Sequence, residues 1–184
     1  MRQLRSKTAI RNVMRAARDE WNPIELAIML QDWSDPYNVG GMFRVADACG
    51  AKELILTGKS AEPPHPQVAV TSMGAHRRVP YRYFEKHEEA ALAVKADGYS
   101  LIAVEVTDGT KHYMRYPYPD KVCLVLGNEQ IGVYQQLLKH CDGAVYIPMN
   151  GKGRSMNVHV AAAVVAFEVL LGDRDSSEEG DTEE

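Results

Sequence analysis

The pattern of apolar and polar positions changes its period along this chain in a way that predicts alternating strands and helices. Six short apolar-rich runs have the length and composition of buried strands: 25–31, 53–57, 79–84, 99–106, 122–126 and 144–147. Five stretches between and after them repeat their apolar positions at helical spacing: about 39–49, 67–75, 85–96, 131–140 and 155–171. Because strands and helices alternate, the pattern predicts an α/β fold with a mostly parallel sheet and helices on both of its faces.

The first residues form a separate unit in this pattern. Over residues 4–21 the apolar positions recur mostly every three or four residues, and the arginines occupy the other faces of the helix that this spacing predicts. Asn22 and Pro23 then end the helix. We therefore expect a basic amphipathic helix over 1–22 and one α/β domain over 23–172.

The last predicted helix is apolar on almost every side between Val158 and Phe167. A helix of this kind is buried over most of its surface. In one domain of a 184-residue chain, that much apolar surface suggests that the helix contacts a partner as well as the core.

Composition places the chain among soluble globular proteins, with 45% hydrophobic and 25% charged residues. Its apolar runs are shorter than the ~20 residues of a membrane span, and its start lacks an apolar signal-peptide core, so we expect a cytoplasmic location. The widely spaced cysteines predict buried, reduced thiols: Cys49, Cys123 and Cys141. The histidines lack the spacing of metal ligands, so we expect no metal.

Charge is distributed unevenly along the chain. The net charge is −4, but residues 173–184 alone carry −6, which leaves the rest at +2. That acidic tail has no apolar residue and is expected to be disordered. Basic residues gather in 2–18 and 77–86, as expected for contacts with a nucleic-acid phosphate backbone, and the candidate contacts are Arg11, Arg15, Arg77 and Arg78. A solvated protein surface is the simpler interpretation of each cluster.

The segment 35–44 follows the first predicted strand directly and places two glycines between Asn38 and Arg44. Ligands of open α/β sheets bind at the carboxyl ends of strands. Glycine lets the main chain approach a ligand closely, and arginine offers a forked donor suited to phosphate. The alternative is a plain strand-to-helix turn with a surface arginine.

Two later segments repeat this arrangement. Segment 123–132 is a strand that leads into an acidic loop flanked by glycines, and segment 147–158 is a short strand, a Gly-rich loop and a helix start. In this order and at these separations, the three segments closely resemble the signature motifs of the SpoU (TrmH-like) RNA 2′-O-ribose methyltransferases of the SPOUT superfamily. The resemblance covers about residues 24–171. It implies a C-terminal trefoil knot, a homodimer packed through its first and last helices, and methyl transfer from S-adenosyl-L-methionine to a ribose 2′-hydroxyl of RNA.

The resemblance also implies residue roles. The catalytic set of the family corresponds to Asn38, Arg44, Glu129, Ser155 and Asn157. Its cofactor site corresponds to Val106, Thr107, Leu126, Gly127, Ile147, Met149, Ser155 and Met156. The alternative for Leu126 and Ile147 is core packing, and for Ser155 it is a helix N-cap.

Arg44 is expected to stabilise charge on the attacking oxygen or to anchor a phosphate, because a guanidinium with a pKa above about 12 is a poor base. We expect Asn38 to position Arg44 or the ribose, and Glu129 to hold Arg44 or Asn157. The general base is left unassigned. His159 departs from the family pattern, in which many members carry a small residue there.

The substrate could be tRNA or rRNA, and a non-catalytic or a different enzymatic function is also conceivable for this fold. The chain lacks the added RNA-binding domain of some rRNA-modifying relatives, which favours tRNA over rRNA. A non-catalytic RNA-binding protein on the same fold has no need of the full catalytic set. A nucleotide hydrolase or a dehydrogenase is disfavoured, because neither the P-loop pattern nor Gly-x-Gly-x-x-Gly is present.

Overall fold

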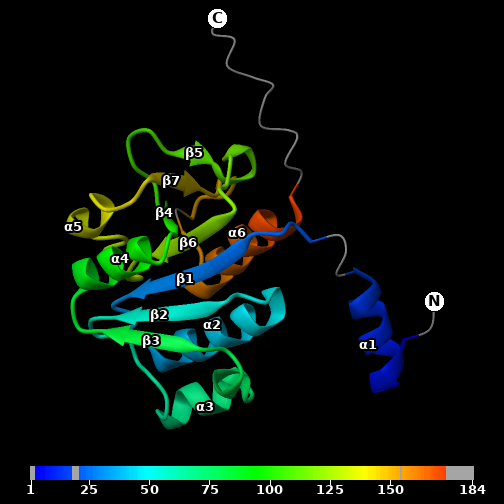
Figure 1. The fold of residues 1–184 in the computed structure, drawn as a ribbon. Coiled ribbons are helices and arrows are strands. Elements are labelled where there is room, and N and C mark those ends of the chain that lie inside the picture. Colours follow the sequence, from blue (N-terminus) through cyan, green and yellow to red (C-terminus); the bar gives the residue numbers. More distant parts are fainter. Residues whose placement is uncertain (1–2, 18–20, 154, 173–184) are drawn as a thin grey trace, which may run out of the picture.

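The computed structural model describes residues 3–17, 21–153 and 155–172. Within these ranges the chain forms one seven-stranded sheet with helices on both faces (Figure 1). Helix α1 (Lys7–Ala16) lies apart from this body in Figure 1 and contains no buried residue. The predicted disordered tail and Arg2 and Arg18 of the first basic cluster fall outside the described residues.

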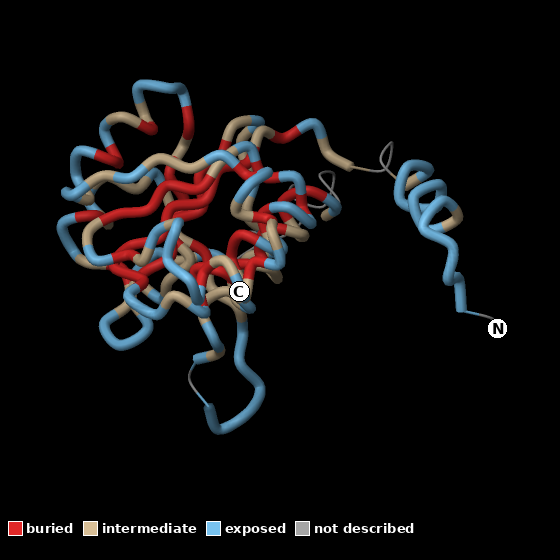
Figure 2. The backbone as a smooth tube through the Cα atoms, turned by 90° about the horizontal axis from the view of Figure 1, so that it is seen from below, coloured by how far each residue is buried: buried red, intermediate tan, exposed pale blue. Residues whose placement is uncertain are grey.

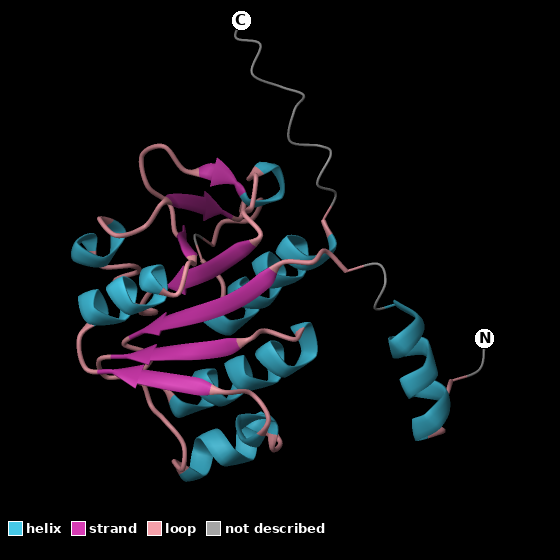
Figure 3. Cartoon of the chain, viewed as in Figure 1, coloured by secondary structure: helices cyan, strands magenta, loops and turns pink. Residues whose placement is uncertain are grey.

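All neighbouring strands of the sheet are parallel, in the order β3-β2-β1-β6-β4-β7-β5 (Figure 3). The strands are β1 (Glu25–Gln31), β2 (Glu53–Thr57), β3 (Tyr81–Phe84), β4 (Ser100–Val104), β5 (Lys111–His112), β6 (Lys121–Leu126) and β7 (Gly143–Tyr146). The α/β class and the parallel sheet are thereby confirmed. The two-residue edge strand β5 was not predicted, because so short a run has no periodic pattern.

Two sets of helices cover the two faces of the sheet. Helices α2 (Pro36–Cys49), α3 (Pro66–Ser72) and α6 (Val158–Leu171) cover one face, and α4 (His87–Ala96) and α5 (Gln135–Leu138) cover the other. Short 3-10 turns follow α3 (Ala75–Arg77) and β5 (Tyr113–Arg115). Successive side chains of a strand point to opposite faces, so Ile28 belongs to the α2 and α6 core and Met29 to the α4 and α5 core. Figure 2 shows the buried residues gathered in the interior of the body, with exposed residues around them.

Helix boundaries differ from the prediction where capping decides them. Helix α2 begins at Pro36 rather than 39, because the Asp35 carboxylate accepts the Tyr37 N–H at 2.8 Å and proline suits the first turn. Helix α5 is shorter than the predicted 131–140, because Asn128 and Gly132 exchange backbone hydrogen bonds in a turn and Gly132 has a φ of +78°.

The cysteines Cys49, Cys123 and Cys141 are free; Cys49 and Cys123 are buried as predicted, whereas Cys141 is only half-buried. No helix in the described part of the chain is long and apolar enough to cross a membrane. The trefoil knot stays a prediction from the resemblance.

The order of the strands reverses direction beside β1. From β1 the chain continues through β2 and β3 toward one edge, whereas β6, the other neighbour of β1, belongs to the half that ends in β7 and β5. In open parallel sheets, ligands bind at the carboxyl ends of the strands where this reversal occurs. A ligand-binding site is therefore expected at the carboxyl ends of β1 and β6.

Candidate active site

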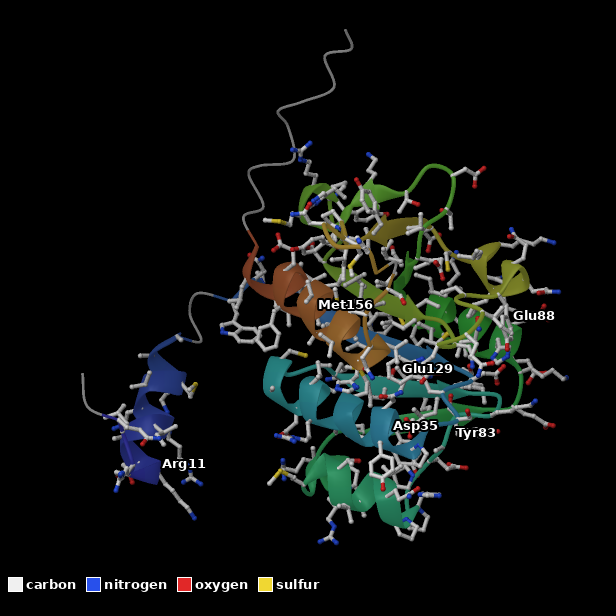
Figure 4. The ribbon with its side chains drawn as sticks, turned by 180° about the vertical axis from the view of Figure 1, so that it is seen from behind. Arg11, Asp35, Tyr83, Glu88, Glu129 and Met156 are labelled. Atoms are coloured by element: carbon white, nitrogen blue, oxygen red, sulfur yellow. The ribbon has the colours of Figure 1, made fainter. Side chains whose placement is uncertain are left out.

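A cavity of about 670 Å³ lies at the carboxyl ends of β4, β6 and β7, beside the start of α6. Three loops that are distant in the sequence form its walls, and Figure 4 shows Glu129 and Met156 from two of them on the same side of the molecule as Asp35. The predicted cofactor residues that line it are Val106, Leu126, Gly127, Ile147, Met149, Ser155 and Met156. A cavity of this size with mixed apolar and polar walls suits a nucleoside-sized ligand.

Thr107, also a predicted cofactor residue, does not line this cavity. Its backbone N–H donates to Thr110 Oγ1 at 2.6 Å, and Thr110 Oγ1 donates in turn to the Thr107 carbonyl at 2.5 Å. This turn places Thr107 in a separate surface hollow with Asp108 and Gly109. The prediction took the strand to residue 106, whereas β4 ends at Val104, so Thr107 has already left the wall of the cavity.

The loop after β6 is fixed by two side chains from the end of β1. The buried indole of Trp33 donates its Nε1–H to the Gly127 carbonyl at 2.9 Å. Buried Gln31 donates from Nε2 to the Gly132 carbonyl at 3.1 Å, and its Oε1 accepts the Tyr134 N–H at 2.8 Å. The sequence signal for these contacts was a polar residue at the end of an otherwise apolar strand, which the prediction overlooked.

Glu105 is a second residue that the sequence prediction missed. One carboxylate oxygen accepts the Val106 N–H and the other accepts the Val133 N–H, both at 2.9 Å. Glu105 also lines the cavity. Its carboxylate therefore joins the loop after β4 to the loop after β6 and adds a negative charge to the wall.

Gly127 is the first residue after β6, and its own loop folds back onto it. A Cβ atom at this position would overlap the backbone of Gly132 and Val133. Backbone atoms cannot rotate away as a flexible side chain can, so only glycine fits at this position.

Polar side chains from all three motifs meet beside the cavity. Asn38, only 8% exposed, donates from Nδ2 to Glu129 Oε1 at 2.8 Å. Asn157 Nδ2 donates to Asn38 Oδ1 at 3.0 Å. His159 Nδ1 lies 3.2 Å from the same oxygen. Glu129 therefore contacts Asn38 rather than Arg44 or Asn157, the two partners that the sequence prediction gave it.

Asn157, not Ser155, caps the last helix. The Asn157 Oδ1 accepts the His159 backbone N–H at 3.0 Å, and α6 begins one residue after Asn157. The interpretation of Ser155 as no more than an N-cap is therefore wrong. Ser155 is exposed and lines the cavity.

Arg44 projects from α2 with an exposed side chain. Within the ranges that the structure describes, no residue forms a hydrogen bond or an ion pair with it. Its position on α2 keeps the guanidinium on the same helix as Asn38 while leaving the charge available to an external anion.

A second, more polar hollow of about 480 Å³ adjoins the first at the ends of β1 and β6. The two share the loop residues 128–131, while Asn38 lines the second hollow and its partner Asn157 lines the first. The hydrogen bond between these two asparagines therefore spans the border between the hollows.

Asp32, at the base of the second hollow, has a φ of +54° and is held in that conformation by hydrogen bonds. Its carboxylate accepts the Lys59 N–H at 2.6 Å and the Tyr134 hydroxyl at 2.8 Å. Burial alone would raise the pKa of Asp32, but these hydrogen bonds outweigh it and hold the pKa below its usual value. Asp32 is therefore ionised at neutral pH.

Residues 25–167 match the model of the family described as SpoU rRNA Methylase. That range is most of the chain and includes both hollows and the asparagine pair. The chain belongs to the SpoU rRNA methylase family. The resemblance drawn from the three motifs is thereby confirmed.

Curated relatives within this SpoU family include enzymes that act on two kinds of RNA. A tRNA (guanosine(18)-2′-O)-methyltransferase of Thermus thermophilus is 31% identical over 78% of this chain and 73% of its own length. A 23S rRNA (guanosine-2′-O-)-methyltransferase of Neisseria meningitidis is 32% identical over 78% of this chain but only 57% of its own.

Solved structures share the fold. An AdoMet-bound rRNA methyltransferase from Sinorhizobium meliloti has a TM-score of 0.74 and 28% identity, and covers 79% of this chain and 55% of its own. The SpoU methyltransferase AviRb from Streptomyces viridochromogenes, in complex with AdoMet, has a TM-score of 0.71 and 27% identity over 79% and 56% of the two chains. The chain thus spans a little over half the length of these solved relatives.

The basic cluster at 77–86 is partly neutralised by carboxylates. Arg78 forms two hydrogen bonds with Asp47, at 3.0 and 2.7 Å. Arg82 pairs with Glu53 at 2.6 Å and with Asp97 at 2.8 Å. Arg77 is exposed and pairs with none of the carboxylates in the described chain. Of this cluster, Arg77 is therefore the best placed for a phosphate.

The described residues contain no group of three or more His, Cys, Asp or Glu side chains placed to hold a metal ion.

Proposed function

We propose that this chain is an RNA 2′-O-ribose methyltransferase, a cytoplasmic homodimer that uses S-adenosyl-L-methionine and acts on tRNA in preference to rRNA. The observation that carries this proposal is the network of Asn38, Glu129 and Asn157 at the border of two hollows. One hollow has the size for a nucleoside cofactor, and the other reaches the outer surface at the ends of β1 and β6. The preference for tRNA is supported by the tRNA methyltransferase of Thermus thermophilus, 73% of whose length the chain covers.

The lining of the first hollow fits S-adenosyl-L-methionine. Gly127 lets the loop after β6 fold tightly onto Gly132 and Val133, and this loop forms one wall of the hollow. Leu126 and Ile147 offer apolar walls for an adenine ring, and Glu105 offers a carboxylate to a ligand with cationic groups. When bound, the cofactor supplies a methyl group activated by a sulfonium.

The residues at the border hold and orient the ribose. Asn38 and Glu129 present an amide and a carboxylate that hydrogen-bond to hydroxyl groups, and their mutual bond at 2.8 Å fixes both. Arg44 supplies a permanent positive charge that binds an RNA phosphate and stabilises negative charge on the attacking oxygen. The hydroxyl of Ser155 lies on the cofactor side of this border and can orient the same group.

Dimer formation is supported by apolar surface on two helices. On α6 the side chains of Val160 and Leu171 are 44% and 45% exposed. On α1, Val13 and Met14 are 53% and 64% exposed, and no residue of this helix is buried within the chain. Surfaces of this kind are normally covered, and a second copy of the chain would cover both.

RNA contact is supported by exposed arginines on two surfaces. Arg11 and Arg15 are exposed on α1, and Arg77 and Arg78 are exposed after α3, where Arg78 already pairs with Asp47. Cations at these positions would bind the phosphate backbone without reading sequence.

The proposal is tested by incubating the purified chain with methyl-labelled S-adenosylmethionine and unmodified bulk tRNA or rRNA. A methyl group on the 2′-oxygen blocks alkaline cleavage of the next phosphodiester, so the label should appear in alkali-resistant dinucleotides, and more from tRNA than from rRNA. Binding of both cofactor and RNA without any transfer of label would instead indicate a non-catalytic RNA-binding protein.

A further inference from the structure

His159, the second residue of α6, adjoins the proposed site. Its Nδ1 lies 3.2 Å from Asn38 Oδ1, and Asn157 Nδ2 donates to that oxygen at 3.0 Å. Because Glu129 Oε1 is 2.8 Å from the other end of the Asn38 side chain, that end must be the NH₂ group, which gives the carboxylate a donor. Asn38 Oδ1 is therefore an acceptor, and His159 donates to it from Nδ1.

This hydrogen bond selects one tautomer of the imidazole. Burial lowers the pKa of His159, and the nearby Asp35 carboxylate only partly offsets that effect. With a pKa below its ordinary value, the ring is neutral at pH 7 and carries a single N–H. The bond to Asn38 places that hydrogen on Nδ1 and leaves Nε2 unprotonated.

The imidazole ring also packs closely against α2 at Gly41. A Cβ atom at Gly41 would lie 3.2 Å from Cγ, Cδ2 and Nδ1 of His159, so the imidazole rests against the backbone of α2. A side chain at position 41 would displace the ring by a few tenths of an ångström. Gly41 and His159 therefore act as a matched pair that sets the distance between the ring and Asn38.

We propose that His159 is a positioning residue that locks the orientation of the Asn38 amide for methyl transfer. A carbonyl oxygen has two lone pairs, and Asn157 Nδ2 and His159 Nδ1–H occupy both of them on Asn38 Oδ1. The amide is then committed to point one N–H at Glu129, and the second N–H is left for the ribose oxygen, where it stabilises developing negative charge. An amide free to flip would present an acceptor to that oxygen. This inference rests on the proposed function.

The kinetic test compares two substitutions at His159 in the full-length chain. In His159→Ala the turnover of methyl transfer should fall on the order of 10–100-fold, as misplaced reacting groups typically cost, while the Kd for S-adenosylhomocysteine is unchanged. In His159→Asn, whose amide NH₂ can stand near the place of Nδ1–H, most of that loss should be recovered. His140→Ala, at a histidine that lines neither hollow, serves as the control. Equal loss in the Ala and Asn variants would overturn the proposal.

A double-mutant cycle of Gly41 and His159 tests whether the packing of the ring against α2 contributes to turnover. Gly41→Ala should slow turnover in the otherwise wild-type chain but should add little to His159→Ala, because the ring that it displaces is already gone. Independent, additive losses would show that Gly41 acts without His159 and would contradict the proposed pair.

The tautomer gives a readout that does not depend on activity. Imidazole ¹⁵N chemical shifts of His159 at pH 7 should show a protonated Nδ1 and an unprotonated Nε2, and in Asn38→Ala this preference should weaken. A protonated Nε2 with an unprotonated Nδ1 in the wild-type chain would contradict the proposed hydrogen bond to Asn38. If the wild-type chain transfers no methyl group at all, the proposed function fails, whereas the ¹⁵N result still decides how His159 is held.

Discussion

The substitution Gly127→Ala should displace the loop after β6 and break the hydrogen bonds that hold it to the end of β1. The added methyl group would overlap the backbone of Gly132 and Val133, so the loop after β6 has to move on one side or the other. No side-chain rotation can relieve this overlap. The displacement required is large enough to break hydrogen bonds, since these weaken steeply beyond their normal length.

The size of the effect follows from the bonds that hold the loop. The Gly127 carbonyl accepts from Trp33 at 2.9 Å, the Gly132 carbonyl from Gln31 at 3.1 Å, and the Val133 N–H donates to Glu105 at 2.9 Å. Each such bond contributes a net ~1 kcal/mol, so moving the loop costs about 3 kcal/mol. A ligand bound at the displaced loop loses contacts of comparable free energy, which corresponds to roughly 100-fold in Kd.

Isothermal titration of S-adenosylhomocysteine into the wild-type and Gly127→Ala proteins measures this loss, and circular dichroism confirms that the variant is folded. Gly151→Ala is the matched control, because the nearest atom to a Cβ there is the Gly153 nitrogen at 4.0 Å. The control should bind with wild-type affinity. If folded Gly127→Ala binds as tightly as the control does, the loop after β6 is not part of the cofactor site.

Three further predictions concern catalysis, assembly and RNA binding. Arg44→Ala should keep its fold and cofactor affinity but transfer methyl groups ~10²–10³ times more slowly, whereas Asn38→Ala should lose less; a near-normal rate in Arg44→Ala would remove its assignment. Light scattering at micromolar concentration should give the mass of a dimer, and a monomer mass would contradict the role given to the apolar surfaces of α1 and α6. Replacing Arg11 and Arg15 by Ala should weaken binding to different RNAs about equally and flatten the log–log salt slope by roughly 0.7–0.9 for each lost phosphate contact. An unchanged slope would confine α1 to dimer contacts.

Periodicity alone predicted the parallel α/β sheet, because each central strand is a continuous apolar run and each covering helix repeats at its own spacing. It misplaced the ends of elements where a single hydrogen bond decides them. Asp35 starts α2 three residues early, and the turn closed by Asn128 and Gly132 shortens α5. Such bonds depend on local geometry that hydrophobic patterns do not record.

The motifs placed most of the candidate site, since residues at the carboxyl ends of adjacent parallel strands must come together. They did not give the partners within it. Asn38 joins Glu129 to Asn157 only because α2 and α6 pack side by side on one face of the sheet, which is a contact between residues more than a hundred positions apart. Trp33 and Glu105 were missed for the same reason, because each looks like an ordinary strand end until the loop that it holds is in place.

Methyl transfer to ribose in RNA leaves a product that can be mapped in cells. Mass spectrometry of tRNA and rRNA digests from cells with the intact gene, with a deletion, and with the deletion complemented by the Arg44→Ala chain would locate the product. We expect one or a few 2′-O-methylated nucleotides, in tRNA, that are present with the intact gene and absent or strongly reduced in the other two strains. Identical ribose methylation in all three strains would contradict the proposed function.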